Sequence, residues 1–77
     1  MRKRYIYRVI SESLSHEDIG EYISHGIVAM FKRKPVEIIS DVHVSKREVK
    51  KLVKKCNRYK LEICHLRDII EDFLISI

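Results

Sequence analysis

The chain contains little of what many small binding and catalytic motifs require. Its 77 residues include two glycines, two cysteines, one proline and no long apolar run. Gly20 and Gly26 stand alone, so no glycine-rich loop is present to cradle a phosphate. Cys56 and Cys64 do not form a disulfide framework, and we expect reduced thiols. No apolar stretch approaches the ~20 residues of a membrane span, so we expect no membrane partner.

Charged residues are plentiful and unevenly distributed, with 16 basic and 11 acidic side chains and a net charge of +5. Residues 9–31 carry four acids and no Lys or Arg, whereas residues 46–60 carry eight basic groups and one acid. The basic start lacks a following apolar segment and a small-residue cleavage site, so we expect a cytoplasmic protein. The length fits one domain, residues 1–77.

An amphipathic helix is predicted over residues 46–57. Val49, Leu52, Val53 and Cys56 follow the spacing of one helix face. Ser45 precedes this run and Glu48 follows three residues later, which is the capping-box pattern: the hydroxyl accepts an amide, and the carboxylate returns to the amide of the cap.

Asn57 follows the helix as an expected left-handed stop, because asparagine tolerates that conformation. The opposite face of the helix is densely basic. Its candidate contact residues for a partner or a phosphate are Lys46, Arg47, Lys50, Lys51, Lys54, Lys55 and Arg58. Such a face is either a solvated surface or a patch that meets phosphate or an acidic protein, since like charges on one helix repel each other.

The remaining segments predict an α+β fold. Residues 4–13 are expected to form a strand with Tyr5, Tyr7 and Val9 on one face, and residues 11–20 a connection. Residues 16–25 are either a short helix or, as we favour, the start of a strand over 21–31. Residues 36–43 form a third strand in a hairpin with the second, with Val36, Ile38 and Val42 on one face.

A last helix is expected over residues 64–76, with a wide apolar stripe. We therefore predict a small three-stranded antiparallel sheet followed by a two-helix hairpin packed on one face. The other sheet face would keep apolar side chains, which suggests a homodimer or another protein partner.

Several short runs resemble an uncharacterised domain-of-unknown-function family of spore-forming Firmicutes. They are Ser24-His25-Gly26-Ile27, Ile39-Ser40-Asp41-Val42, Leu52-Val53 with Cys56-Asn57, and the run from His65 to Leu74. The resemblance covers about residues 20–75 and departs from the family pattern at His25 and Cys64. It implies the strand interpretation of 21–31 and no activity.

The sequence supplies few candidates for chemistry. No paired Cys or His spacing of the zinc kind is present, and we expect no metal, no cofactor and no catalytic residue. Cys64 and His65 are adjacent at a helix start and are expected to point in different directions. Cys64 is the only candidate nucleophile, and the alternative is a packed helix-start residue.

Three functions remain open at this point. The first is a non-enzymatic interaction module or regulator that binds a protein with an acidic surface. The second is a non-specific nucleic-acid binder that uses the basic helix face over 46–58. The third, suggested by size and charge alone, is a mobile-element inhibitor of a nucleic-acid-handling enzyme.

Overall fold

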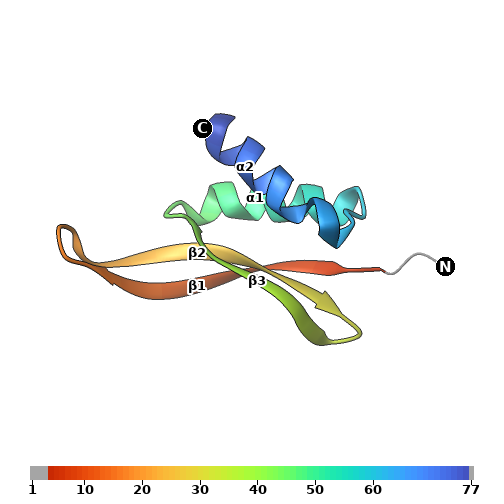
Figure 1. Ribbon diagram of the computed structural model, residues 1–77, viewed down its shortest axis with the longest axis horizontal. Coiled ribbons are helices and arrows are strands. Elements are labelled where there is room, and N and C mark those ends of the chain that lie inside the picture. The colour runs from red at the N-terminus through yellow and green to blue at the C-terminus, as the bar shows by residue number, and fades with distance from the viewer. Residues whose placement is uncertain (1–3, 77) are drawn as a thin grey trace.

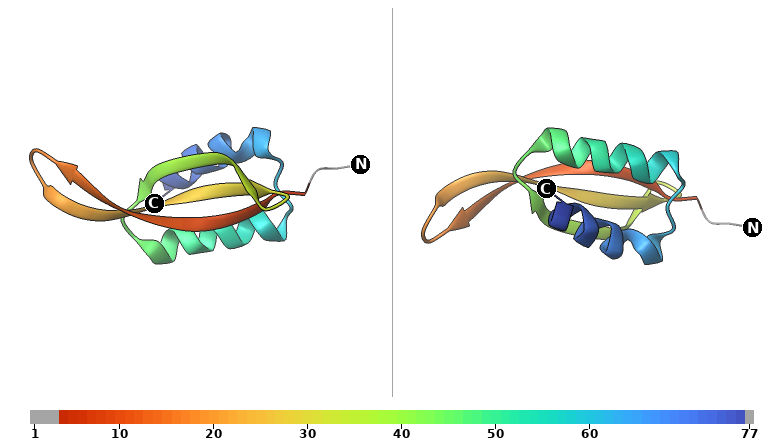
Figure 2. Two further views of the ribbon diagram at one scale, coloured as in Figure 1. Left: turned by 90° about the horizontal axis from the view of Figure 1, so that it is seen from below. Right: turned by 90° about the horizontal axis from the view of Figure 1, so that it is seen from above.

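The computed structural model describes residues 4–76 and orders them as three strands followed by two helices (Figure 1). The elements are β1 (Ile6–His16), β2 (Gly20–Phe31), β3 (Lys34–His43), α1 (Lys46–Arg58), a 3-10 turn (Ile63–His65) and α2 (Leu66–Ser76). The strands form one antiparallel sheet in the order β1-β2-β3. Both helices lie over the same face, α1 beside β1 and α2 toward β3 (Figure 2). The predicted α+β architecture is confirmed.

The hydrophobic core lies between α1 and the sheet. The four residues of the predicted α1 stripe are all buried: Val49, Leu52, Val53 and Cys56. They pack with apolar side chains on the helix-facing side of the sheet and on α2: Tyr7, Ile27, Ala29, Val42, Leu66 and Ile70. Tyr5 and Val9 also pack against this core, as the alternation along the first strand predicts.

The first hairpin is longer than expected. Residues 11–20 are not a connection, because β1 continues to His16 and pairs with β2 in an unbroken register from Ile6↔Met30 to His16↔Gly20. The strand interpretation of residues 16–25 is therefore correct apart from the turn at 17–19, and the helix alternative is wrong. The polar side chains of residues 11–16 favoured a connection, but the backbone N–H and C=O groups of these residues are satisfied by pairing with β2.

A bulge between Ile39 and His43 interrupts the alternation of side chains expected along β3. The register of β3 against β2 shifts between His25 and Ile27, and Asp41 has φ 54°. Ile38 is 57% exposed whereas Val42 is 6% exposed, so the prediction that they share a face is wrong. Three residues of β3 between Ile39 and His43 lie opposite the single residue Gly26 of β2, and the left-handed conformation of Asp41 in this segment turns Val42 toward the core. Gly26 lies beside this bulge, where a Cβ atom would overlap the carbonyl oxygen of Ile39.

The ends of the helices also differ from expectation. The predicted last helix over 64–76 begins as a 3-10 turn, and α2 proper starts at Leu66. α1 continues through Asn57 to Arg58, and the residue with positive φ is Lys60, at 51°. Asn57 is therefore not the left-handed stop.

The side chain of Asn57 instead joins α1 to the edge of the sheet. Its Oδ1 accepts a hydrogen bond from the backbone N–H of Tyr7 at 2.8 Å, and its Nδ2 donates to the Tyr7 carbonyl at 2.9 Å. The amide thus replaces a neighbouring strand at this point of β1. The Tyr7 hydroxyl donates to the carbonyl of Leu61 at 2.7 Å, which holds the connection to α2 on the same residue.

We predict that Asn57→Ala lowers the free energy of unfolding by about 1–3 kcal/mol, because it removes both bonds and leaves two backbone groups of Tyr7 without their partners. Asn57→Asp keeps one acceptor and loses the donor, so it should also destabilise the protein. Urea denaturation followed by circular dichroism measures both. An Asn57→Ala variant as stable as the parent would contradict the role of this amide.

Tyr7 should also make the protein sensitive to alkali. Burial raises the pKa of Tyr7 from 10.0 to about 12, with smaller contributions from Cys56, Tyr5 and Cys64. The folded state holds this proton more tightly than the unfolded chain, so the stabilisation is complete below about pH 10 and is lost as pH rises toward 12. In urea denaturation between pH 9 and 12, Tyr7→Phe should lose less stability than the parent; parallel losses would refute this.

Candidate functional site

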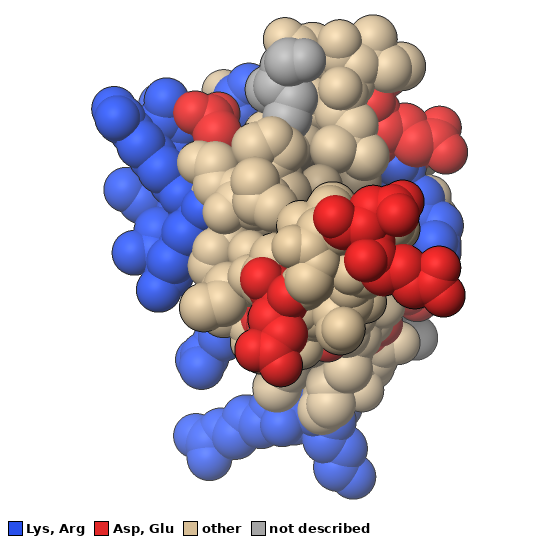
Figure 3. Space-filling view, turned by 90° about the vertical axis from the view of Figure 1, so that its left-hand side faces the viewer, with Lys and Arg blue, Asp and Glu red and all other residues tan. Residues whose placement is uncertain are grey.

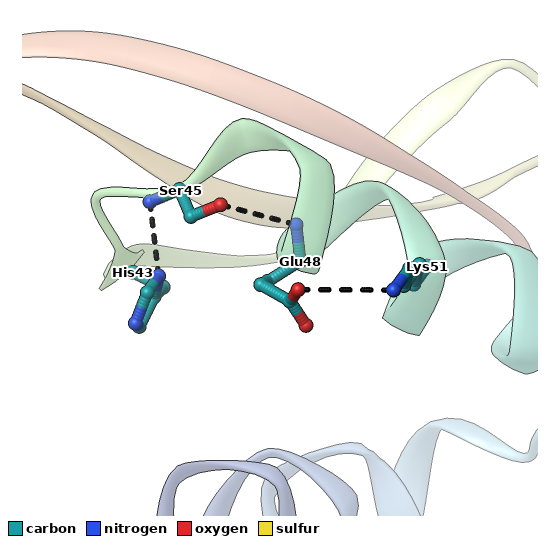
Figure 4. Close-up of polar contacts among 4 residues, drawn as sticks. All are labelled: His43, Ser45, Glu48 and Lys51. Atoms are coloured by element: carbon teal, nitrogen blue, oxygen red, sulfur yellow. Dashed lines mark hydrogen bonds and ion pairs between the residues drawn. The ribbon is translucent and has the colours of Figure 1, made fainter. Parts of the chain in front are cut away.

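The basic face begins at a well-defined helix N-terminus (Figure 4). The Ser45 hydroxyl accepts a hydrogen bond from the backbone N–H of Glu48 at 3.4 Å, as predicted. The second half of the expected capping box is not formed. The backbone N–H of Ser45 donates instead to Nδ1 of His43 at 2.9 Å, and the Glu48 carboxylate lies 3.8 Å from Nζ of Lys51. The imidazole accepts the hydrogen bond that was expected for the Glu48 carboxylate, because β3 ends at His43, two residues before the cap.

All seven predicted contact residues are exposed on α1. They are Lys46, Arg47, Lys50, Lys51, Lys54, Lys55 and Arg58. Within residues 4–76, Lys51 is the only member of the set in an ion pair, and the guanidinium of Arg58 lies 5.9 Å from the centre of the Tyr59 ring. The face therefore holds a concentration of positive charge with little compensation from its own helix.

The helix geometry divides these residues between two flanks. Lys46 and Lys50 are four residues apart and share one side of the helix, and neither lines the groove between α1 and α2, so they lie on the flank away from α2. Lys51 and Lys55 lie on the flank that faces α2, where both line an open groove between the two helices. The two flanks carry equal charge but have different neighbours.

The groove combines an apolar floor with charged walls. A cavity of about 460 Å³ between α1 and α2 is lined by Leu52, Ile69 and Phe73, with Glu48, Lys51 and Lys55 on the α1 side and Asp72 and Ser76 on the α2 side. A second cavity of about 300 Å³ shares Lys55 and Ile69 and continues toward Cys56, Tyr59 and Leu61. The two together form the α1–α2 groove. Apolar side chains here are partly open to solvent between two helices that do not close on each other.

Charge is segregated on the surface around the groove. Figure 3 shows basic residues along the α1 flank and acidic residues gathered on the turn of the first hairpin, which faces the viewer. The apolar C-terminal part of α2 lies above them, where Leu74 is 45% and Ile75 83% exposed. The structure thus presents a basic flank, an apolar groove and an acidic hairpin turn as neighbouring features.

The groove could not be found from the sequence by the reasoning above. Both helices have apolar stripes, and a hairpin packed on one face of the sheet, as expected, would have buried both stripes against the sheet. One feature of the sequence did point to it: the apolar stripe of α2 is wider than the part that the fold buries, which is Leu66 and Ile70. Ile69 and Phe73 pack against the edge of the core and remain partly accessible.

One group of possible metal ligands lies outside the groove. Ligand atoms of Glu62, Cys64 and His65 lie within 4.8 Å of one another, so the expectation that Cys64 and His65 point in different directions is wrong. The 3-10 turn over Ile63–His65 brings them to one side. All three are exposed, which leaves any further coordination position to solvent and is unlike a closed structural zinc site.

The histidine at the base of the hairpin has a structural contact. Nδ1 of His25, a residue only 7% exposed, lies 2.8 Å from the Ser11 hydroxyl across the paired strands β1 and β2. This contact ties the two strands together where the helix layer ends. In the described part of the chain, no helix has the length and apolar character needed to cross a membrane.

Comparison with known proteins identifies a family for nearly the whole chain. A family model described as "Family of unknown function (DUF6514)" matches residues 1–76. The match extends beyond the residues 20–75 that carried the expected resemblance, and it agrees with membership of a domain family of unknown function. No curated protein and no solved structure matches the chain.

The two thiols should report on the accessibility of the groove floor. Cys64 is exposed, whereas Cys56 is 3% exposed and burial raises the pKa of its thiol. A disulfide reagent such as DTNB at pH 8 should modify Cys64 at once and Cys56 only as the chain opens, because the thiolate is the reactive form. Cys64→Ser should remove the fast phase alone. Equal rates for both thiols would show that the groove floor is open to reagent.

Proposed function

This chain belongs to the DUF6514 family, and we propose that it is a small non-enzymatic interaction module, acting in the cytoplasm, that binds an acidic segment of a protein. The binding site is the α1–α2 groove with its lysine-bearing wall. The sequence resemblance described above adds spore-forming Firmicutes as the proposed setting. The observation that carries the proposal is the apolar groove beside Lys51 and Lys55.

The apolar floor is what favours a protein partner over a nucleic acid. A phosphate backbone is bound by positive charge alone and gains little from Leu52, Ile69 and Phe73. A peptide segment with apolar side chains on one face and carboxylates along its edge would fill the floor and meet the lysines at once. Helices bind grooves of this kind through anchors spaced by three or four residues.

The charge on α1 supports the same partner. Lys55 lies on the groove wall with no ion pair among residues 4–76, and Lys51 is paired with Glu48 at the outer limit of an ion pair, 3.8 Å. Carboxylates of a partner would relieve repulsion among the lysines. Complementary charge of this kind also speeds association and excludes basic partners.

The proposal predicts that the two flanks of α1 contribute differently. A labelled acidic amphipathic peptide should bind the parent, and Lys51→Glu/Lys55→Glu should weaken binding at least tenfold, or about 1.4 kcal/mol. Lys46→Glu/Lys50→Glu is the matched control, with the same change of charge on the flank away from the groove. Its effect should stay within about twofold, because Lys46 and Lys50 do not line the groove and exposed charges outside it are screened by salt. Fluorescence anisotropy measures all three.

Labelled duplex DNA and single-stranded RNA provide the comparison between functions. Under the proposal, a peptide of equal charge without apolar side chains and both nucleic acids bind more weakly than the amphipathic peptide. A nucleic-acid binder would instead prefer DNA or RNA, lose affinity equally in both charge-reversal variants, and weaken steeply between about 50 and 200 mM salt. That outcome would overturn the proposal in favour of the nucleic-acid alternative.

A further inference from the structure

The first hairpin extends beyond the layer of helices as a separate arm. Residues 12–24, here called the hairpin arm, project past the start of α1 and the end of α2 (Figures 1 and 2). The buried apolar core includes no residue of this arm among the residues described. Its base is nevertheless fixed, because the hydroxyls of Ser24 and Tyr22 both donate to the Asp41 carboxylate at the β3 bulge.

The exposed end of the arm has the chemistry that the α1–α2 groove requires. Glu17, Asp18 and Glu21 are exposed, and residues 9–31 contain no Lys or Arg. Two large apolar side chains stand among these acids with nothing covering them: Ile19 is 70% exposed and Ile23 is 62% exposed. The arm is therefore an acidic segment with apolar anchors, held in place by strand pairing.

The arm also presents these residues on the correct side of the sheet. Glu21 and Ile23 are separated from the core residue Ile27 by even numbers of residues along β2, so they lie on the face of the sheet that carries the helices. The arm projects at the end of the molecule where α1 begins and α2 ends (Figure 1), and Glu48 in the first turn of α1 and Ser76 at the end of α2 line the groove. A two-fold rotation between two chains thus lays the helix-side face of each arm over the groove of the other.

We propose that a second copy of this chain supplies the acidic segment, each hairpin arm occupying the α1–α2 groove of the other chain in a two-fold dimer. This inference rests on the groove of the proposed function and names its partner. Glu17, Asp18 and Glu21 face Lys51 and Lys55, while Ile19 and Ile23 reach the floor at Leu52, Ile69 and Phe73. Because each contact is made twice, the assembly closes at two chains.

A charge exchange tests the pairing directly. Glu17→Lys/Asp18→Lys/Glu21→Lys makes both arm and groove basic, and Lys51→Glu/Lys55→Glu makes both acidic. Each variant alone should be monomeric at concentrations at which the parent is dimeric. Mixed in equal amounts, the two should form a dimer again, since both arm–groove contacts regain opposite charges. Sedimentation velocity between about 50 and 500 mM salt measures the mass, and the dimer should weaken as salt screens the pairing.

The control is Lys46→Glu/Lys50→Glu, which should dimerise like the parent, and circular dichroism verifies folding of every variant. A monomeric parent at all concentrations, or a dimer that persists in both single variants, would overturn the inference. Persistence would place the contact elsewhere, as on the uncovered sheet face around Ile6 and Ile38. If the parent is monomeric yet binds the acidic amphipathic peptide, this inference fails while the proposed function stands; if the peptide also fails to bind, both fail.

Discussion

The contact between Asn57 and Tyr7 is the constraint on which the rest of the arrangement depends. It lies where the end of α1 meets the edge strand β1, and it satisfies backbone groups that no neighbouring strand reaches. The Tyr7 hydroxyl holds Leu61, so one residue positions both the end of α1 and the connection to α2. The α1–α2 groove lies between the two helices that this connection joins, and Leu61 itself lines one end of it.

The sequence predicted the elements better than the contacts between them. The stripe of Val49, Leu52, Val53 and Cys56 could be predicted because burial on a helix has a fixed period. Asn57 was misinterpreted because its partner is 50 residues away, and local propensity describes only its neighbours. The face of Val42 was missed because a bulge with a left-handed residue, Asp41, interrupts the alternation without a local signal in the sequence. The basic face could be located from residue types, but its division into two flanks depends on where α2 lies.

A domain of this size can bury only a modest core, and here the distribution of exposed groups is as informative as the core itself. Repulsion along α1 costs some stability in the free protein, since only Lys51 finds an acid among the described residues. Partly open apolar residues on the groove floor, such as Ile69 and Phe73, add a further cost in water. One acidic, apolar ligand removes both costs together, whereas a polyanion removes only the first. For this reason the groove and the lysines are better interpreted as one site than as two.

The hairpin arm carries exposed acidic and apolar side chains of its own. An isolated two-stranded ribbon is only marginally stable in water, and the arm lies outside the helix layer that supports the rest of the sheet. The hydroxyls of Tyr22 and Ser24 donate to Asp41, and the contact between Ser11 and His25 lies at the base of the arm; both restrict the directions in which the arm can point. An acidic projection and a preformed groove with lysines on its wall therefore occur on one chain, and they lie apart in the single molecule. This separation is what the proposed two-fold dimer would resolve, since each chain would offer its arm to the groove of the other.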